Sequence, residues 1–167
     1  MDISKINNPQ ARFFIESFSR NRRINKEFYK LIPEDKLDFR MVNTAQRKSD
    51  SPRESLAHQV DVTRDYIQGV KTGILKFGNK YPDLLDLKQY SKKELIDKLE
   101  EAEKELVEIL TGPKVGDKKI QAPWGNVGAI DLLWGLHEHE ILHTGWNLAI
   151  MDHLSIERFP GLKKMWG

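Results

Sequence analysis

Apolar residues spaced three or four positions apart dominate four long stretches of the chain, residues 8–31, 51–76, 91–111 and 126–155. In the third stretch, Leu95, Leu99 and Leu106 recur at the period of an α-helix and not with the alternation of a strand. Long helices that each carry one apolar face bury those faces most simply against one another. The sequence therefore predicts an all-α fold, a four-helix bundle.

Capping signals mark the starts of the second and third helices. Ser51 offers a hydroxyl at the N-cap, Pro52 suits the first helical position, and Glu54 follows at the third. Ser91 and Glu94 repeat the same capping-box spacing before the third stretch. We therefore expect these two helices to begin at these serines.

The breaks between the helices differ in length and composition. Pro33 ends the first helix, because a proline ring cannot continue the hydrogen-bond ladder. The connection over residues 33–50 is long enough to allow a crossover, and residues 112–126 predict a loop with room for a short hairpin. We expect the C-terminal tail to pack against the body through Phe159 and Trp166.

Length and composition exclude several classes of protein. The chain has 167 residues, which predicts one domain over residues 1–167. It has no cysteine, which excludes a disulfide scaffold, a thiolate metal site and a cysteine nucleophile. A net charge of +2 is too small to indicate nucleic-acid binding. No secretory signal or membrane-spanning run is visible, so we expect a cytoplasmic protein with no membrane partner.

Three of the five histidines are placed to share one metal ion. His139 and His143 are four residues apart on the core-facing stripe of the last helix, about 6 Å apart along its axis, and His58 lies on the core stripe of the second helix. An isolated pair would fit hydrogen-bonded core histidines equally well. A third inward histidine favours a three-nitrogen site with open positions, the layout of a catalytic metal. Zn, Ni, Fe and Cu all suit such ligands.

The neighbouring titratable residues have less certain roles. His137 points to another helix face, and His153 lies too far along the helix to share the metal, so both are expected bystanders. Asp61, one turn after His58, is a candidate to orient a ligand imidazole, with a surface role as the equal alternative. Glu140 is a weak candidate for a catalytic group and equally a surface charge or an outer hydrogen-bonding partner of the ligands.

The segment 139–143 also spells H-E-x-x-H, the helix motif of zinc proteases. The longer metzincin pattern needs Gly at 146 and His at 149, where this chain has Trp146 and Ala149. No strand-rich subdomain precedes the motif. A peptidase is therefore disfavoured.

The residues around the histidines resemble those of a known protein family. The segment 139–146, HEILHTGW, resembles the H-E-x-x-H-x-G-Q motif of the DinB/YfiT-like metalloenzymes, with Trp146 where Gln is usual. His58 resembles the histidine that the family carries on its second helix, and the ending around Phe159-Pro160 is similar to endings of its members. The likeness spans essentially the whole chain.

The resemblance implies a homodimeric four-helix bundle that holds one divalent metal ion, Zn or Ni first and Fe or Mn next, on His58, His139 and His143. It also implies a small-molecule substrate and a low-molecular-weight thiol, because characterised relatives include bacillithiol, mycothiol and glutathione enzymes. The leading hypothesis is thus a metal-dependent thiol S-transferase. The alternatives are a metal-dependent hydrolase with the same ligands and a non-enzymatic metal-binding stress protein.

Several basic residues are candidates for contacts with a substrate or a partner. Arg47, Lys48 and Arg64 are candidates to bind the carboxylates of the thiol, and solvated charges are the commoner role for such residues. A second basic cluster on the first helix, flanked by glutamates, predicts a solvated helix face; it consists of Arg20, Arg22, Arg23 and Lys26.

Overall fold

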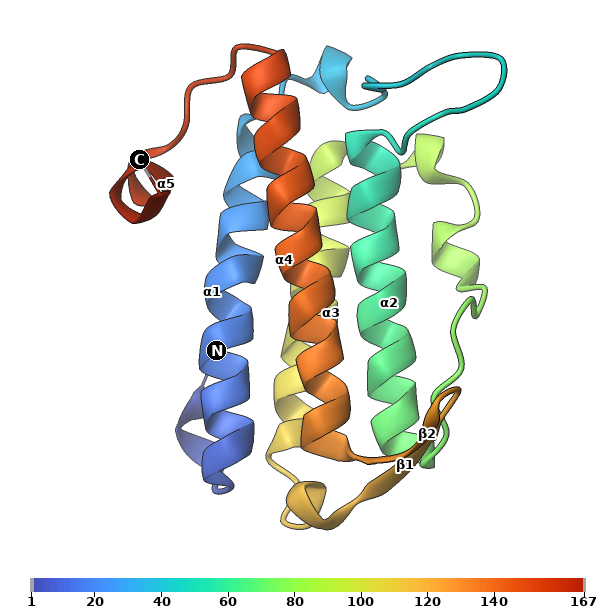
Figure 1. Cartoon of the computed structure of the whole chain (residues 1–167), viewed down its shortest axis with the longest axis vertical. Coiled ribbons are helices and arrows are strands. Elements are labelled where there is room, and N and C mark those ends of the chain that lie inside the picture. The colour runs from blue at the N-terminus through green and yellow to red at the C-terminus, as the bar shows by residue number, and fades with distance from the viewer. Residues whose placement is uncertain (1, 167) are drawn as a thin grey trace.

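The structure, a computed structural model, describes residues 2–166 and is built mainly from α-helices (Figure 1). The helices are α1 (Pro9–Leu31), α2 (Pro52–Thr72), α3 (Lys92–Leu110), α4 (Ala129–His153) and the short α5 (Pro160–Trp166). The strands β1 (Lys119–Ala122) and β2 (Gly125–Gly128) form one antiparallel hairpin, with Ile120 opposite Val127. The prediction of an all-α four-helix bundle is confirmed, and the short hairpin for which residues 112–126 left room is present over residues 119–128.

The four long helices run up, down, down and up (Figure 1). α1 packs mainly against α4, and α2 packs mainly against α3. Arg53 at the start of α2 donates to the carbonyl of Tyr90 just before α3 at 2.8 Å, so these helices begin at the same end of the bundle. Lys92 of α3 donates to the carbonyl of Ile32 at 2.8 Å, so α3 begins where α1 ends.

The connection that returns along the whole bundle is the one between α2 and α3, residues 73–91 (Figure 1). The connection over residues 33–50, which is long enough to allow a crossover, stays at one end and joins helices that lie on a diagonal. Its length lets it reach the diagonally opposite helix and form part of the wall of a cavity beside the histidines. The crossover that the sequence allowed in this connection is found instead between α2 and α3.

Local chemistry fixes the ends of the helices. Ser51 and Ser91 both form full capping boxes, with Glu54 and Glu94 returning a hydrogen bond to the serine N–H. α2 ends at Thr72, short of the expected residue 76, because Gly73 adopts the left-handed conformation, with φ of 82°, that terminates a helix. α4 begins at Ala129, three residues later than expected, because residues 125–128 pair with β1.

The core consists of two apolar clusters stacked along the bundle axis. One gathers around Phe14 and Phe18 of α1, and the other around Phe28 of the same helix and Leu99 of α3. Phe159 packs against the second cluster, as expected for the tail, while the side chain of Trp166 lies outside the described residues. No helix in the described part of the chain is long and apolar enough to cross a membrane.

Asp83 clamps the returning connection to the bundle. Arg64 of α2 donates to both of its carboxylate oxygens, at 2.8 and 3.0 Å, and Lys98 of α3 donates to one of them at 2.9 Å. The hydrogen bonds from Arg64, and then those from Lys98, lower the pKa of Asp83 to about 2 against the opposing effect of burial. This carboxylate therefore stabilises the fold only while it is ionised.

We predict that Asp83→Asn destabilises the protein at neutral pH by no more than about 1 kcal/mol, since the pair is partly exposed. The folded-state pKa lies below the ordinary value of 3.8, so the stabilisation is complete above that pH and disappears as the pH falls through about 2. Urea unfolding of the parent and of Asp83→Asn, from neutral pH down to about pH 2, measures how far their free energies of unfolding converge. Asp117→Asn, at an exposed site, is the control and should track the parent. A constant difference between Asp83→Asn and the parent down to pH 2 would contradict the assignment.

Candidate metal centre

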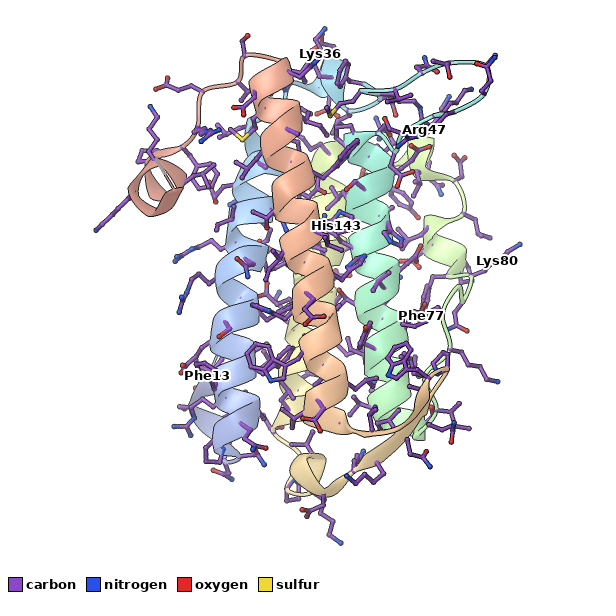
Figure 2. The ribbon with its side chains drawn as sticks, viewed as in Figure 1. Phe13, Lys36, Arg47, Phe77, Lys80 and His143 are labelled. Atoms are coloured by element: carbon purple, nitrogen blue, oxygen red, sulfur yellow. The ribbon has the colours of Figure 1, made fainter. Side chains whose placement is uncertain are left out.

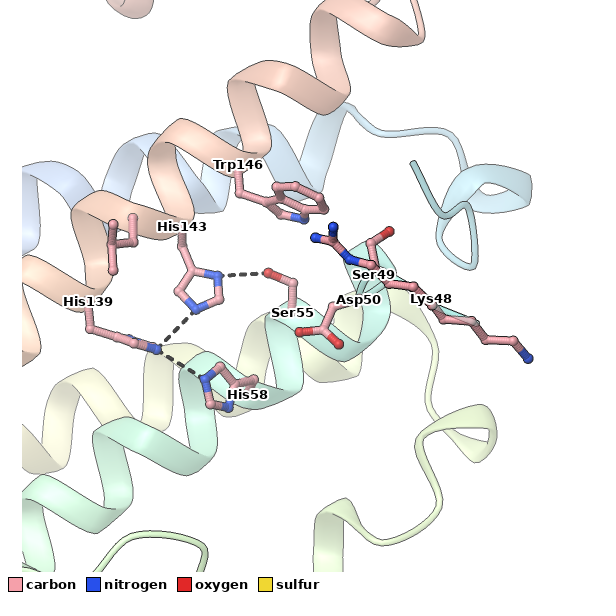
Figure 3. A pocket seen from close by; sticks show the side chains of 10 residues that line it. Lys48, Ser49, Asp50, Ser55, His58, His139, His143 and Trp146 are labelled. Atoms are coloured by element: carbon pink, nitrogen blue, oxygen red, sulfur yellow. Dashed lines mark hydrogen bonds between the residues drawn. The ribbon is translucent and has the colours of Figure 1, made fainter. Parts of the chain in front are cut away.

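Three histidine side chains converge between α2 and α4 (Figure 3). His139 Nε2 lies 3.1 Å from His58 Nε2 and 3.2 Å from His143 Nε2. One ligand atom from each ring lies within 4.8 Å of those of the other two. The structure thus brings together the three histidines selected from the sequence.

The surroundings keep two of these rings neutral. Burial, and then the nearby histidines, lower the pKa of His139 to about 4 and the pKa of His143 to about 3. A neutral imidazole has a lone pair on one nitrogen, which is the form that binds a metal. Neutral rings whose Nε2 atoms face one another provide a donor set that fits a divalent ion of the zinc or nickel type.

Ser55, which the sequence analysis did not select, sets the orientation of one ring. Its Oγ hydrogen-bonds Nδ1 of His143 at 2.8 Å (Figure 3), and Tyr29 donates to the same oxygen at 3.2 Å. When Nδ1 carries the proton, Nε2 presents its lone pair to the other two histidines. Ser55 lies one helical turn before His58, which is the only signal in the sequence that marks it.

Glu140 points away from the three histidines and into the core. Its side chain is fully buried, with an oxygen 2.9 Å from the guanidinium of Arg22, and Asn25 donates to the other oxygen at 2.7 Å. Burial raises the pKa of Glu140, and Arg22 opposes that shift. This position gives Glu140 a role in joining α1 to α4, and it does not support the weak catalytic candidacy.

Arg22 corrects the expectation of a solvated basic face on the first helix. It is fully buried, donates to Thr63 Oγ1 at 2.8 Å and stacks its guanidinium 4.7 Å from the Phe18 ring centre. Phe14, Phe18, Arg22 and Asn25 share the inner stripe of α1, at spacings of four, four and three. That spacing was the signal that Arg22 faces inward.

The other residues predicted to be near the site do not join the three histidines. His137 lies 3.1 Å from the amide nitrogen of Asn21, and the ring of His153 lies against Phe39, so neither joins the three histidines. Asp61 makes no hydrogen bond or ion pair within residues 2–166, so it does not orient His58. Burial, and then the charge of Asp65, raise the pKa of Asp61 to about 6.

A cavity of about 440 Å³ opens beside the histidines (Figure 3). Arg47 and Lys48 from the 33–50 connection line its mouth, and Leu142 and Trp146 of α4 form an apolar wall. Neither basic side chain has an acidic partner in the described part of the chain. Arg64, the third basic candidate, is already paired with Asp83 and does not line this cavity.

Comparisons with known proteins agree with this architecture. No family model and no curated protein matches the chain. Among solved structures, the DinB-like protein YjoA of Bacillus subtilis superposes with a TM-score of 0.66 at 20% identity, covering 88% of this chain and 94% of its own. A DinB-like protein of Bacillus cereus gives 0.66 at 16% identity, covering 87% and 93%. The chain has the DinB-like fold. At these identities the likeness confirms the expected DinB-like architecture, and the chemistry rests on the site itself.

We predict that Arg22→Ala lowers the free energy of unfolding by about 3–5 kcal/mol, because it leaves the Glu140 carboxylate buried without its counter-ion. Arg23→Ala, at an exposed position on the same helix, should change it by less than about 0.5 kcal/mol. Urea unfolding measures both.

The double variant Arg22→Met with Glu140→Leu tests whether the pair is structural. Replacing both charges with apolar side chains removes the unpaired charge, so this protein should recover most of the stability that Arg22→Ala loses. It should also keep the metal-binding capacity of the parent. A stable double variant that has lost metal binding would show that Glu140 acts on the site directly.

Proposed function

We propose that this protein is a divalent-metal-dependent enzyme of the DinB type that transfers a low-molecular-weight thiol to a small electrophile. The observation that carries the proposal is the convergence of His58, His139 and His143 beside a cavity in a DinB-like fold. Three imidazoles suit several divalent transition metals, and the proposal of Zn or Ni, with Fe or Mn as alternatives, rests on the family resemblance. The proposal retains a homodimer, which rests on the family resemblance.

The thiol must come from outside the chain, because the chain has no cysteine. A divalent ion on the three histidines supplies one chemical function, the stabilisation of a thiolate at neutral pH. The protein provides the rest by binding and positioning. Arg47 and Lys48, unpaired at the cavity mouth, hold carboxylates of the thiol compound, and Leu142 and Trp146 exclude water from one side.

The proposed reaction is a nucleophilic substitution. The sulfur forms a bond to the electrophilic carbon, and the bond from that carbon to the leaving group breaks as the leaving group departs with the electron pair. The thiol proton passes to solvent through the open cavity. No side chain of the cluster needs to act as a base, which agrees with the burial of Glu140.

A metal-dependent hydrolase and a non-enzymatic metal-binding protein are the alternatives. Hydrolysis is helped by a general base near the attacking water, and the burial of Glu140 against Arg22 removes the base that the sequence offered. The transferase is therefore favoured over the hydrolase. A purely structural metal would leave the two cations and the apolar wall of the cavity without use.

We predict that metal content falls at least about tenfold in each of His58→Ala, His139→Ala and His143→Ala, because each variant removes one of three nitrogen ligands. Elemental analysis after mild purification and a zinc titration of metal-free protein measure the loss. His137→Ala and His153→Ala are matched controls on α4 that should retain the metal. Full metal content in His58→Ala would refute the three-histidine site.

We predict that the metal-loaded protein consumes monochlorobimane only when bacillithiol or glutathione is present. Arg47→Ala with Lys48→Ala should raise KM for the thiol about tenfold while changing kcat little, because the two cations bind the thiol outside the reacting centre. Lys119→Ala, an exposed cation on β1, is the control. Hydrolytic turnover of ester or amide substrates without any thiol would favour the hydrolase instead. Metal uptake with no turnover of either kind, with neutral and with cationic electrophiles, would favour the non-enzymatic protein.

A further inference from the structure

A second cavity, of about 370 Å³, borders two of the same histidines and has a different character. His58 and His139 line both cavities. The first cavity extends toward Ser55 at the start of α2, whereas the second extends the other way along α2, past Asp61 to Tyr66. His58 and His139 therefore lie between the two cavities, and His143 borders the first one alone. We call the second one the Asp61 cavity, lined by His58, Asp61, Asp65, Tyr66, Phe77 and His139.

Asp61 is the one carboxylate of this cavity that lacks a partner. Its Oδ1 is buried and makes no hydrogen bond in the part of the chain that the structure describes. The neighbouring cation, Arg64, is held in a two-pronged pair by Asp83. A carboxylate in a partly buried wall is costly unless a donor or cation meets it. This cost makes Asp61 a candidate to bind a positively charged ligand.

Asp65, the second acid in the wall, is fully occupied by the protein. Its carboxylate accepts from the N–H of Gly78 at 3.0 Å, from the Asn79 amide at 2.7 Å and from the Tyr81 hydroxyl at 2.9 Å. These three bonds fasten the start of the returning connection onto α2. Asp65 therefore shapes the cavity, and Asp61 is left to meet what enters it.

Phe77 of the fastened connection and Tyr66 of α2 place aromatic rings in the wall of the same cavity as Asp61. Phe77 lies next to α2 in Figure 2, with its ring centre 5.6 Å from that of Tyr66 and 6.2 Å from that of Trp124. Phe77 remains 47% exposed and Trp124 60% exposed, which is unusual for large apolar side chains in contact with one another. Aromatic faces attract cations through the negative charge density of the ring. Together with a carboxylate, they form a surface suited to an organic ammonium group.

The group that fits is an organic cation and not a second metal ion. Within residues 2–166, only the three histidines bring three potential metal ligands together. One free carboxylate with aromatic walls lacks the ligand number that a metal ion requires. An amine with an apolar body can satisfy both parts of the wall at once.

We propose that the Asp61 cavity is a specificity subsite for a substrate that carries an ammonium group, with Asp61 as its counter-ion and Phe77 and Tyr66 as its apolar wall. The assignment rests on the proposed function for the claim that the neighbouring histidines are the reaction centre. It identifies the electrophile as a cationic compound, which approaches from the side opposite to Arg47 and Lys48. Binding of the cation itself does not depend on the metal.

Benzylamine and benzyl alcohol, a cation and its neutral counterpart of similar shape, test the subsite. Calorimetric titration of the metal-free protein should show that benzylamine binds about tenfold more tightly. The isosteric Asp61→Asn should abolish that preference, and Phe77→Leu should weaken benzylamine severalfold. Glu101→Gln, which removes the same charge from an exposed site on α3, should leave the preference intact. Asp61→Asn should keep or raise the melting temperature, because no hydrogen bond is lost.

Titrating the zinc-loaded protein separates the two proposals. A benzylamine preference in the metal-free protein that depends on Asp61 supports the subsite, even if zinc fails to bind and the proposed function falls. Equal binding of amine and alcohol overturns the subsite and leaves the three-histidine site standing. Amine binding that requires zinc and survives Asp61→Asn is coordination to the metal and also overturns the subsite.

Discussion

The ion pair between Arg22 and Glu140 is the contact on which the geometry of the site depends. Both side chains are fully buried, so each would be strongly unfavourable without the other. Arg22 also reaches Thr63 of α2, and Asn25 bonds Glu140 from the next turn of α1. One polar cluster thus ties α1, α2 and α4 together in a single register.

That register determines where the histidines point. Glu140 directly follows His139, and successive helical residues are rotated by about 100°. Directing Glu140 toward α1 therefore turns His139, and with it His143 one turn later, toward α2. The H-E-x-x-H segment does not place a general base beside a metal here, as it does in the zinc proteases. Its glutamate fixes the rotation of α4 about the helix axis, so that its histidines face the cavity.

A second polar chain adjusts the ring of His143. Asn147 donates to Asn25 at 2.9 Å, while Tyr29 and Ser55 connect the interior to Nδ1 of His143. Each of these polar groups would cost about 1–3 kcal/mol if left unpaired in the core. The interior of this bundle is therefore organised around polar pairs as well as around its two apolar clusters.

The sequence predicted the features that local chemistry determines. The capping serines at 51 and 91 placed two helix starts, and the four-residue spacing of His139 and His143 placed two rings on one face. The crossover was not predictable, because it depends on which helices pair across the bundle. The clamp on Asp83, in the middle of that connection, holds the segment that makes α2 and α3 parallel. The prediction that Arg22 is solvated was wrong, because it gave more weight to the charge of the side chain than to its position on the apolar stripe of α1.

The two cavities lie on different sides of the histidine cluster and differ in the charges that line them. Arg47 and Lys48 of the 33–50 connection border one side together with Asp50, and Asp61 of α2, which has no hydrogen-bond partner in the described residues, borders the other. Charges fixed in a partly dry site favour one orientation of two reactants without moving during the reaction. Under the proposed function and the proposed subsite, a negatively charged thiol compound and a positively charged electrophile would enter from opposite sides and meet at the histidines. Such positioning would let a site that has no cysteine and no available glutamate favour a substitution between two external molecules.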